Sequence, residues 1–341
     1  KSSPGSSTSA GSGSSSGSSS GASAYPDLDA VVAKLTQRPT SINITTPVKG
    51  PIPGGKTIAF IQCGAPICVS LGKDLAAAAA KVNWKVNPID AGLTAESIKA
   101  AWGQAVTSKP DAVVGSGNPR TLFNPELAQL KAANIPVIDL TMTDPATDGI
   151  TQVYGGPDDW GPVGKNIADY MLVNSGGSPV KELSVTVSSY PNLGLVSGAI
   201  KSEITSKCSS CSAALLDVPG TSIGSDLPTR VVSYLSAHPD INWVYMGFDD
   251  MVTGLPAALQ AAGLSKVKLT TLSVNTTMAG YIKNGQSLVM ATGFDVTEMM
   301  WRSVDYLARL FTSSPLTDNT SAALPMWYVQ KDNLPSTTEN F

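Results

Sequence analysis

The chain has 341 residues and a formal net charge of −3, and only 14% of its residues are charged. This length exceeds that at which a single hydrophobic core usually stops growing, so we expect two lobes. No basic stripe is present, which argues against a nucleic-acid partner. No run of about eighteen apolar residues exists, so the sequence predicts no membrane-spanning helix.

Residues 1–24 are almost entirely Ser and Gly. Such a segment cannot bury enough apolar surface to fold, and we expect a disordered tether. A lipid-anchored exported protein would carry such a tether ahead of its globular body, and an artificial linker is the alternative. Residues 25–54 then predict a short amphipathic helix and an extended, proline-containing strap that leads to the first strand.

A strand, a turn and a helix at residues 56–82 organise the rest of the chain. The apolar run 57–61 is typical of a buried parallel strand. Leu71, Leu75 and Ala79 recur at helical spacing, so the helix that follows has one apolar face. Similar signals then alternate along the chain, with further strands predicted near 84–89, 111–114, 135–140, 152–154, 183–187, 213–218, 243–248, 268–272 and 288–292.

This alternation predicts an α/β protein built from parallel sheets with helices on both faces. We assign residues 55–145 plus 295–320 to an N-terminal lobe and residues 146–294 plus 321–335 to a C-terminal lobe. The chain would then cross between the lobes near 144–149, 293–295 and 316–324.

The four cysteines occur as two close pairs, Cys63 with Cys68 and Cys208 with Cys211. A metal site would need all four to converge, because two thiolates supply only half of a tetrahedral site. The second pair follows a predicted helix and precedes a strand, the reverse of the position of a redox Cys-x-x-Cys motif. We therefore predict two local disulfides, one in each lobe, as in exported proteins, and buried free thiols are the alternative.

Several polar or aromatic residues follow predicted strands, where ligands bind in open α/β sheets. Trp160 begins a helix of the second lobe, Tyr190 follows a strand, and Phe248 ends another. Arg120 and Asp249 also follow predicted strands. Each candidate has a purely structural alternative. Trp160 and Phe248 can belong to the core, Arg120 can be an exposed charge, and Asp249 can cap the next helix.

Four stretches, taken in order and spacing, resemble one known family. They are Pro66–Leu71, Lys109–Val114 with Asn118 and Pro119, Ala132–Ile138, and Trp243–Met251 followed by Gly254 and Gly263. They are similar to the periplasmic sugar-binding proteins of ABC transporters, of the ribose-binding type, over about residues 55–330. The resemblance implies two Rossmann-like lobes with a hinged cleft, the type 1 periplasmic-binding-protein fold. Lipoprotein versions from Gram-positive bacteria also carry Ser/Gly tethers, which implies an extracytoplasmic, cell-surface location.

The positions at which this family binds sugars differ here. The family's two aromatic residues after the first-turn proline correspond to Ile67 and Cys68, and its Asp-Arg pair to Thr141 and Met142. The asparagine of its Asn-Asp motif corresponds to Phe248. Two further polar positions fall near Ser273 and Phe294.

These replacements imply a ligand less polar than a free monosaccharide, because each buried sugar hydroxyl needs a polar partner. One anionic or hydroxyl end would be held by Arg120, Asn118 or Asn275. The competing interpretation is a sugar held by Gln62, Asn118, Tyr190, Asp249 and Asn275. The complete set of predicted ligand-binding residues is Gln62, Cys63, Ile67, Ser116, Asn118, Arg120, Thr141, Met142, Trp160, Tyr190, Phe248, Asp249, Asn275 and Phe294.

The resemblance therefore implies a solute-binding protein of an ABC importer, with a small-molecule ligand and a transporter permease as partners. We expect a monomer that needs no cofactor or metal and touches the membrane only through an N-terminal lipid anchor. An exported ligand sensor of the same fold is the main alternative. An enzyme is disfavoured, because the sequence has no Gly-x-Ser-x-Gly elbow, metal motif or phosphate-binding loop.

Overall fold

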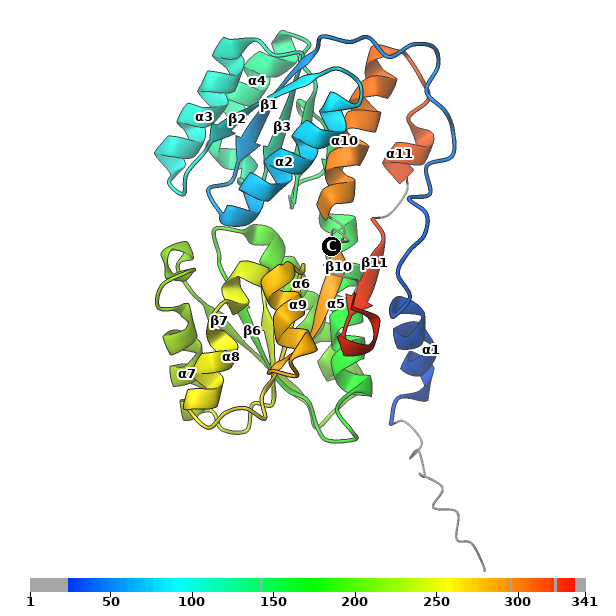
Figure 1. The fold of residues 1–341 in the computed structure, drawn as a ribbon. Helices are drawn as coiled ribbons and strands as arrows, with labels where there is room; N and C mark the ends of the chain where they lie inside the picture. Colours follow the sequence, from blue (N-terminus) through cyan, green and yellow to red (C-terminus); the bar gives the residue numbers. More distant parts are fainter. Residues whose placement is uncertain (1–23, 142, 295, 322–323, 335–341) are drawn as a thin grey trace, which may run out of the picture.

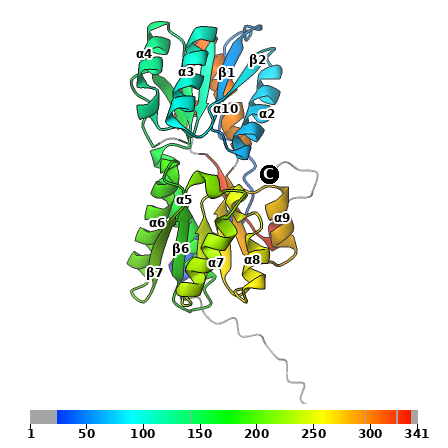
Figure 2. The ribbon, with the colours of Figure 1, turned by 90° about the vertical axis from the view of Figure 1, so that its left-hand side faces the viewer.

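The computed structural model describes residues 24–141, 143–294, 296–321 and 324–334. The chain forms two lobes, each a sheet flanked by helices, and the predicted α/β fold class is confirmed (Figures 1 and 2). Almost all of the predicted tether at 1–24 lies outside the described residues. No helix in the described ranges is long and apolar enough to cross a membrane.

The first lobe contains a five-stranded parallel sheet in the order β2-β1-β3-β4-β5. Along β1, Ile58 and Phe60 join the core under α2 and α10, whereas Ala59 and Ile61 join the core under α3 and α4. Burial on both faces explains the unbroken apolar run. The elements are β1 (Thr57–Gln62), α2 (Pro66–Ala80), β2 (Lys85–Asp90), α3 (Ala95–Ser108), β3 (Ala112–Ser116), α4 (Asn124–Ala132), β4 (Val137–Leu140), β5 (Ile150–Tyr154) and α10 (Val296–Phe311).

The second lobe contains a six-stranded sheet in the order β11-β10-β9-β8-β6-β7, and only β11 runs antiparallel to its neighbour. Helices α5 and α6 cover one face, and α7, α8 and α9 cover the other. The elements are α5 (Pro157–Val173), β6 (Lys181–Thr186), α6 (Pro191–Lys207), β7 (Ser212–Asp217), α7 (Leu227–Ala237), β8 (Trp243–Met246), α8 (Leu255–Ala261), β9 (Lys268–Leu272), α9 (Thr276–Lys283), β10 (Leu288–Phe294) and β11 (Met326–Val329).

The first crossing between the lobes lies later than the sequence predicted. Strand β5 pairs with β4 in the first sheet, so the chain leaves this lobe at Gly155 and Gly156 and not at 144–149. Residues 146–154 therefore belong to the first lobe, which corrects the predicted boundary. The segment before β5 is fixed within that lobe, because Arg120 donates hydrogen bonds to Thr147 and Asp148.

Both predicted disulfides are present, which confirms the pairing. Cys63 and Cys68 bridge the turn between β1 and α2, with their Cα atoms 5.7 Å apart. Cys208 and Cys211 bridge the turn between α6 and β7, with a Cα separation of 5.3 Å. One bridge therefore lies at the cleft end of the first lobe and the other at the far end of the second.

Helices α5 and α6 pack closely at a glycine, which gives a first prediction. A Cβ at Gly164 would collide with the carbonyl oxygen of Val196 and lie 2.8 Å from the Cβ of Ala199. Gly164→Ala should lower the free energy of unfolding by about 1–3 kcal/mol, because overpacking pushes the helices apart. Gly198 has open space at its Cβ position, so Gly198→Ala should raise stability by up to about 1 kcal/mol. Urea denaturation compares the two variants, and equal stabilities would contradict the packing.

A buried carboxyl in β6 gives a second prediction, on pH. Glu182 is 1% exposed and accepts a hydrogen bond from Ser184 Oγ at 2.6 Å. Burial raises the pKa of Glu182 to about 8, so the folded state binds this proton more tightly than the unfolded state.

The contribution of Glu182 to stability should therefore fall as pH rises from about 4.5 to about 8, by up to about 1.4 kcal/mol per pH unit. Glu182→Gln keeps an acceptor for Ser184 and should remove this component of the pH profile. Urea denaturation between pH 5 and pH 8 measures the difference between variant and parent. Parallel profiles would show that Glu182 does not titrate in this range.

Candidate functional site

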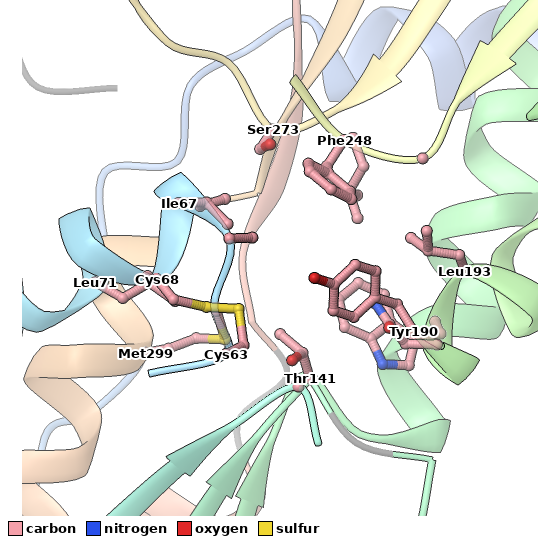
Figure 3. Close-up of a pocket in the computed structure, with 16 residues that line it drawn as sticks. Cys63, Ile67, Cys68, Leu71, Thr141, Tyr190, Leu193, Phe248, Ser273 and Met299 are labelled. Atoms are coloured by element: carbon pink, nitrogen blue, oxygen red, sulfur yellow. A yellow bond between two sulfur atoms is a disulfide. The ribbon is translucent and has the colours of Figure 1, made fainter. Parts of the chain in front are cut away.

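A cavity lies where the carboxyl ends of the strands of both lobes face each other (Figure 3). Its volume is about 80 Å³, several times the roughly 10–15 Å³ that one water requires. Many of its lining residues belong to a single buried cluster that runs through both lobes, so the lobes are in contact around the cavity. The described lining residues are Cys63, Ala65, Ile67, Cys68, Leu71, Gly117, Thr141, Trp160, Tyr190, Asn192, Leu193, Gly247, Phe248, Leu272, Ser273 and Met299.

The wall from the first lobe is built around the Cys63–Cys68 disulfide. Helix α2 begins at Pro66, directly after the turn, and its first residues bring Ile67 and Cys68 to the cavity. Ser116 lies behind the bridge, with its Oγ 3.3 Å from Cys68 Sγ and 3.3 Å from the carbonyl oxygen of Ile61. The bridge therefore presents sulfur to the cavity and is supported from β3.

The wall from the second lobe is aromatic. Phe248 follows β8, and Tyr190 lies at the start of α6. Their rings meet edge to face, with centroids 5.9 Å apart and planes at 81°, an arrangement that stabilises aromatic pairs. Figure 3 shows both rings opposite the disulfide. Trp160, at the start of α5, completes the apolar lining near the crossing between the lobes.

Two polar residues of the lining have an unusual backbone conformation. Thr141 follows β4 with φ 58°, and Ser273 follows β9 with φ 62°. Left-handed backbone is uncommon for residues other than glycine and often marks a functional site. Each residue thus turns the chain sharply at the end of a strand and leaves its hydroxyl at the cavity.

No charged side chain lines the cavity among the described residues. Asp249 lies beside the lining and is buried, with its backbone N–H 3.4 Å from Ser273 Oγ. Burial raises the pKa of Asp249 to about 6, and the neighbouring Asp250 adds to this shift. The pKa of Asp250 is also raised by burial, although a hydrogen bond from the backbone of Ile67 opposes the shift. That last contact joins the two lobes.

Six predicted ligand residues do not line the cavity, and Asp249, which lies beside the lining, is one of them. Arg120 forms an ion pair with Asp148 at 2.9 Å, so its charge is already paired within the first lobe. Asn275 caps α9 by accepting the Met278 N–H at 3.0 Å. The remaining three are Gln62, Ser116 and Asn118.

Asn118 is nevertheless close by in the chain, since Gly117 lines the cavity, and it is 3% exposed. Its Oδ1 has no hydrogen-bond partner within the described structure. Two other predicted residues cannot be placed, because Met142 lies outside the described residues and the structure gives no side-chain description for Phe294. Six residues of the predicted ligand-binding set therefore line the cavity: Cys63, Ile67, Thr141, Trp160, Tyr190 and Phe248. Cys68, which was predicted only as a disulfide partner, lines it as well.

The lining also includes apolar residues that the sequence did not indicate. Leu71 was predicted only as part of the helix face, and Leu193, Leu272 and Met299 look like ordinary core residues in sequence. Met299 comes from α10, which follows β10 of the other lobe. A periodic apolar pattern does not distinguish a residue at the cleft end of a helix from one in the core.

Comparisons with known proteins agree with this geometry. A sequence model of the family described as "Periplasmic binding protein domain" matches residues 58–313. No curated protein is similar enough in sequence to count as a relative.

Three solved structures illustrate the similarity. An ABC sugar transporter subunit from Rhodobacter sphaeroides 2.4.1 has 18% identity and a TM-score of 0.68, over 82% of this chain and 99% of that one. GanP, a glucose-galactose binding protein from Geobacillus stearothermophilus, has 14% identity and a TM-score of 0.72, over 83% and 100%. A carbohydrate transporter from Acidothermus cellulolyticus 11B, in complex with myo-inositol, has 21% identity and a TM-score of 0.70, over 82% and 95%.

These identities show a shared fold, and the family match covers most of the chain. The family match, the shared fold and the two lobes around the cavity lead to the same assignment. The chain belongs to the periplasmic binding protein domain family and has its two-lobed type 1 fold.

Proposed function

We propose that this protein is the extracytoplasmic solute-binding protein of an ABC importer. It binds a small molecule in the cavity between its lobes and presents it to a permease. The observation that supports this role is the position of the cavity, at the carboxyl ends of the strands of both sheets. Ligand binding there would favour the closed arrangement of the lobes.

We further propose that the ligand is uncharged and less polar than a free monosaccharide. Only four side chains of the described lining carry a polar atom other than sulfur or the buried Trp160 nitrogen: Thr141, Tyr190, Asn192 and Ser273. Thr141 already donates its hydroxyl hydrogen to the carbonyl oxygen of Leu140 at 2.7 Å. Each hydroxyl buried without a partner costs about 1–3 kcal/mol, so a sugar with hydroxyls on every carbon would lose affinity.

An apolar or aromatic face on the ligand would gain from the same walls. The rings of Phe248 and Tyr190 on one side and the Cys63–Cys68 sulfur atoms on the other are surfaces that favour a flat ring between them. A sugar remains the second candidate, because two of the structural neighbours are titled as glucose-galactose binding and as a myo-inositol complex.

A third prediction tests the ligand class by isothermal titration calorimetry. In a panel of neutral aromatic metabolites, alicyclic metabolites, pentoses and hexoses, a compound with an apolar ring face should bind most tightly. Phe248→Ala should weaken its binding about 10- to 100-fold, because ring contact and apolar burial are lost. Tyr234→Ala, which removes a ring stacked on His238 away from the cavity, is the control and should leave affinity unchanged. Tight binding of a pentose or hexose that survives Phe248→Ala would rule out the proposed class.

A fourth prediction concerns the disulfide in the cavity wall. Replacing both Cys63 and Cys68 with Ser should lower the free energy of unfolding by about 2 kcal/mol, as should the matched double replacement of Cys208 and Cys211, because both bridges close short loops. Only the first variant should bind the panel's best compound more weakly, since only its bridge lines the cavity. Chemical denaturation and calorimetry separate the two effects, and equal affinities in the two variants would show that the bridge is structural alone.

A further inference from the structure

The segment ahead of the family match connects the two lobes. Helix α1 (Pro26–Leu35) packs against α5 and β11 of the second lobe, with Leu28 and Val32 buried. Asn333 Nδ2, just after β11, donates a hydrogen bond to the carbonyl oxygen of Thr36 at 2.7 Å. Arg38 lies over the ring of Trp327 of β11, 5.7 Å from its centroid. The chain is therefore attached to the second lobe up to Arg38.

From Ile42 onward the same segment is attached to the first lobe. Arg302 of α10 donates a hydrogen bond to the carbonyl oxygen of Ile42 at 2.8 Å, and Arg309 donates one to that of Thr46 at 2.6 Å. Asp318, in α11 (Thr317–Ser321), accepts the Thr46 N–H at 2.7 Å. Figure 1 shows this strap, residues 36–54, running along one side of the molecule from α1 to the top of the first lobe.

The attachment to the first lobe is strong because it satisfies buried charges. Arg302 and Arg309 are each 1% exposed, and each pairs with a carboxylate one turn earlier on α10, Glu298 at 2.5 Å and Asp305 at 2.7 Å. The strap carbonyls accept further hydrogen bonds from these guanidinium groups. Buried charged groups deprived of partners are costly, so peeling the strap from α10 is unfavourable.

Between the two attachments lie Pro39, Thr40 and Ser41. The four Cα–Cα steps from Arg38 to Ile42 span at most roughly 14 Å when fully extended. We propose that the strap is a tether that limits how far the two lobes separate. It adds a connection to the crossings of the family fold, since the family match begins only at residue 58. The proposal rests on the hinged opening that the proposed function requires.

A limit on opening would have a consequence for ligand capture. A two-lobed protein whose open arrangements are restricted spends a larger fraction of time near the closed arrangement. Its apparent affinity for ligand rises in proportion to that fraction. Lengthening the strap should therefore increase opening without touching the cavity, because none of residues 36–54 lines it.

The test inserts a twelve-residue linker between Thr40 and Ser41, in which Gly and Ser residues flank a specific protease site. The control places the same insert between Gly176 and Gly177, in the exposed turn between α5 and β6, where both glycines have open space at the Cβ position. Small-angle X-ray scattering of the ligand-free proteins should show a larger radius of gyration for the strap insertion than for the control. Hydrogen–deuterium exchange of peptides covering 62–71 and 247–252, which contribute to the cavity wall, should become at least about twofold faster.

Cleavage at the inserted site after folding should open the protein at least as widely as the uncleaved insertion does. Because the protein is cut only after it has folded, this measurement does not depend on how the variant folds. Identical scattering and exchange in the strap insertion, its cleaved form and the control would overturn the tether. Since every measurement uses ligand-free protein, an error in the proposed ligand class would leave these results unchanged. A wild-type protein that opens as widely as the cleaved form would likewise refute the proposal.

Discussion

The structure depends on one constraint, the burial of parallel strands on both faces. Parallel strands need crossover connections, which in this protein are helical except between β4 and β5. Helices on both faces leave only the strand ends open to other chemistry. In both lobes these carboxyl ends point to the same gap, so the turns after β1, β4, β8 and β9 meet around one cavity. The position of the site is thus a consequence of sheet topology. Its side chains come from strand ends, from the turns after them and from the helices that begin there.

The chemistry of the lining follows from what occupies those turns. The first turn is closed by the disulfide between Cys63 and Cys68, and both residues line the cavity. Across the cavity, Phe248 and Tyr190 stabilise each other as an edge-to-face pair. The fold is shared with sugar-binding neighbours, but the lining has few hydrogen-bonding groups. A shared fold does not determine the ligand, which depends on the side chains of the lining.

Helix α10 contributes both to the cavity and to the attachment of the strap. Its Met299 lines the cavity, while Arg302 and Arg309 hold the strap by its carbonyl oxygens. The three residues sit on a helix that follows directly after β10 of the other lobe. One helix therefore connects the ligand site, a crossing between the lobes and the tether. This helix also packs on α2 of the first lobe.

The sequence by itself determined the α/β class, the alternation of elements and both disulfides, because apolar periodicity and short cysteine spacing are local properties. It also indicated Ile67, Thr141 and Phe248 at the cavity, through the ligand-binding positions of the resembled family to which they correspond. Only the tertiary structure decided that β5 completes the first sheet, that Arg120 is paired with Asp148, and that Leu193 and Met299 face the cavity. These depend on contacts between residues distant in sequence, which local patterns do not encode.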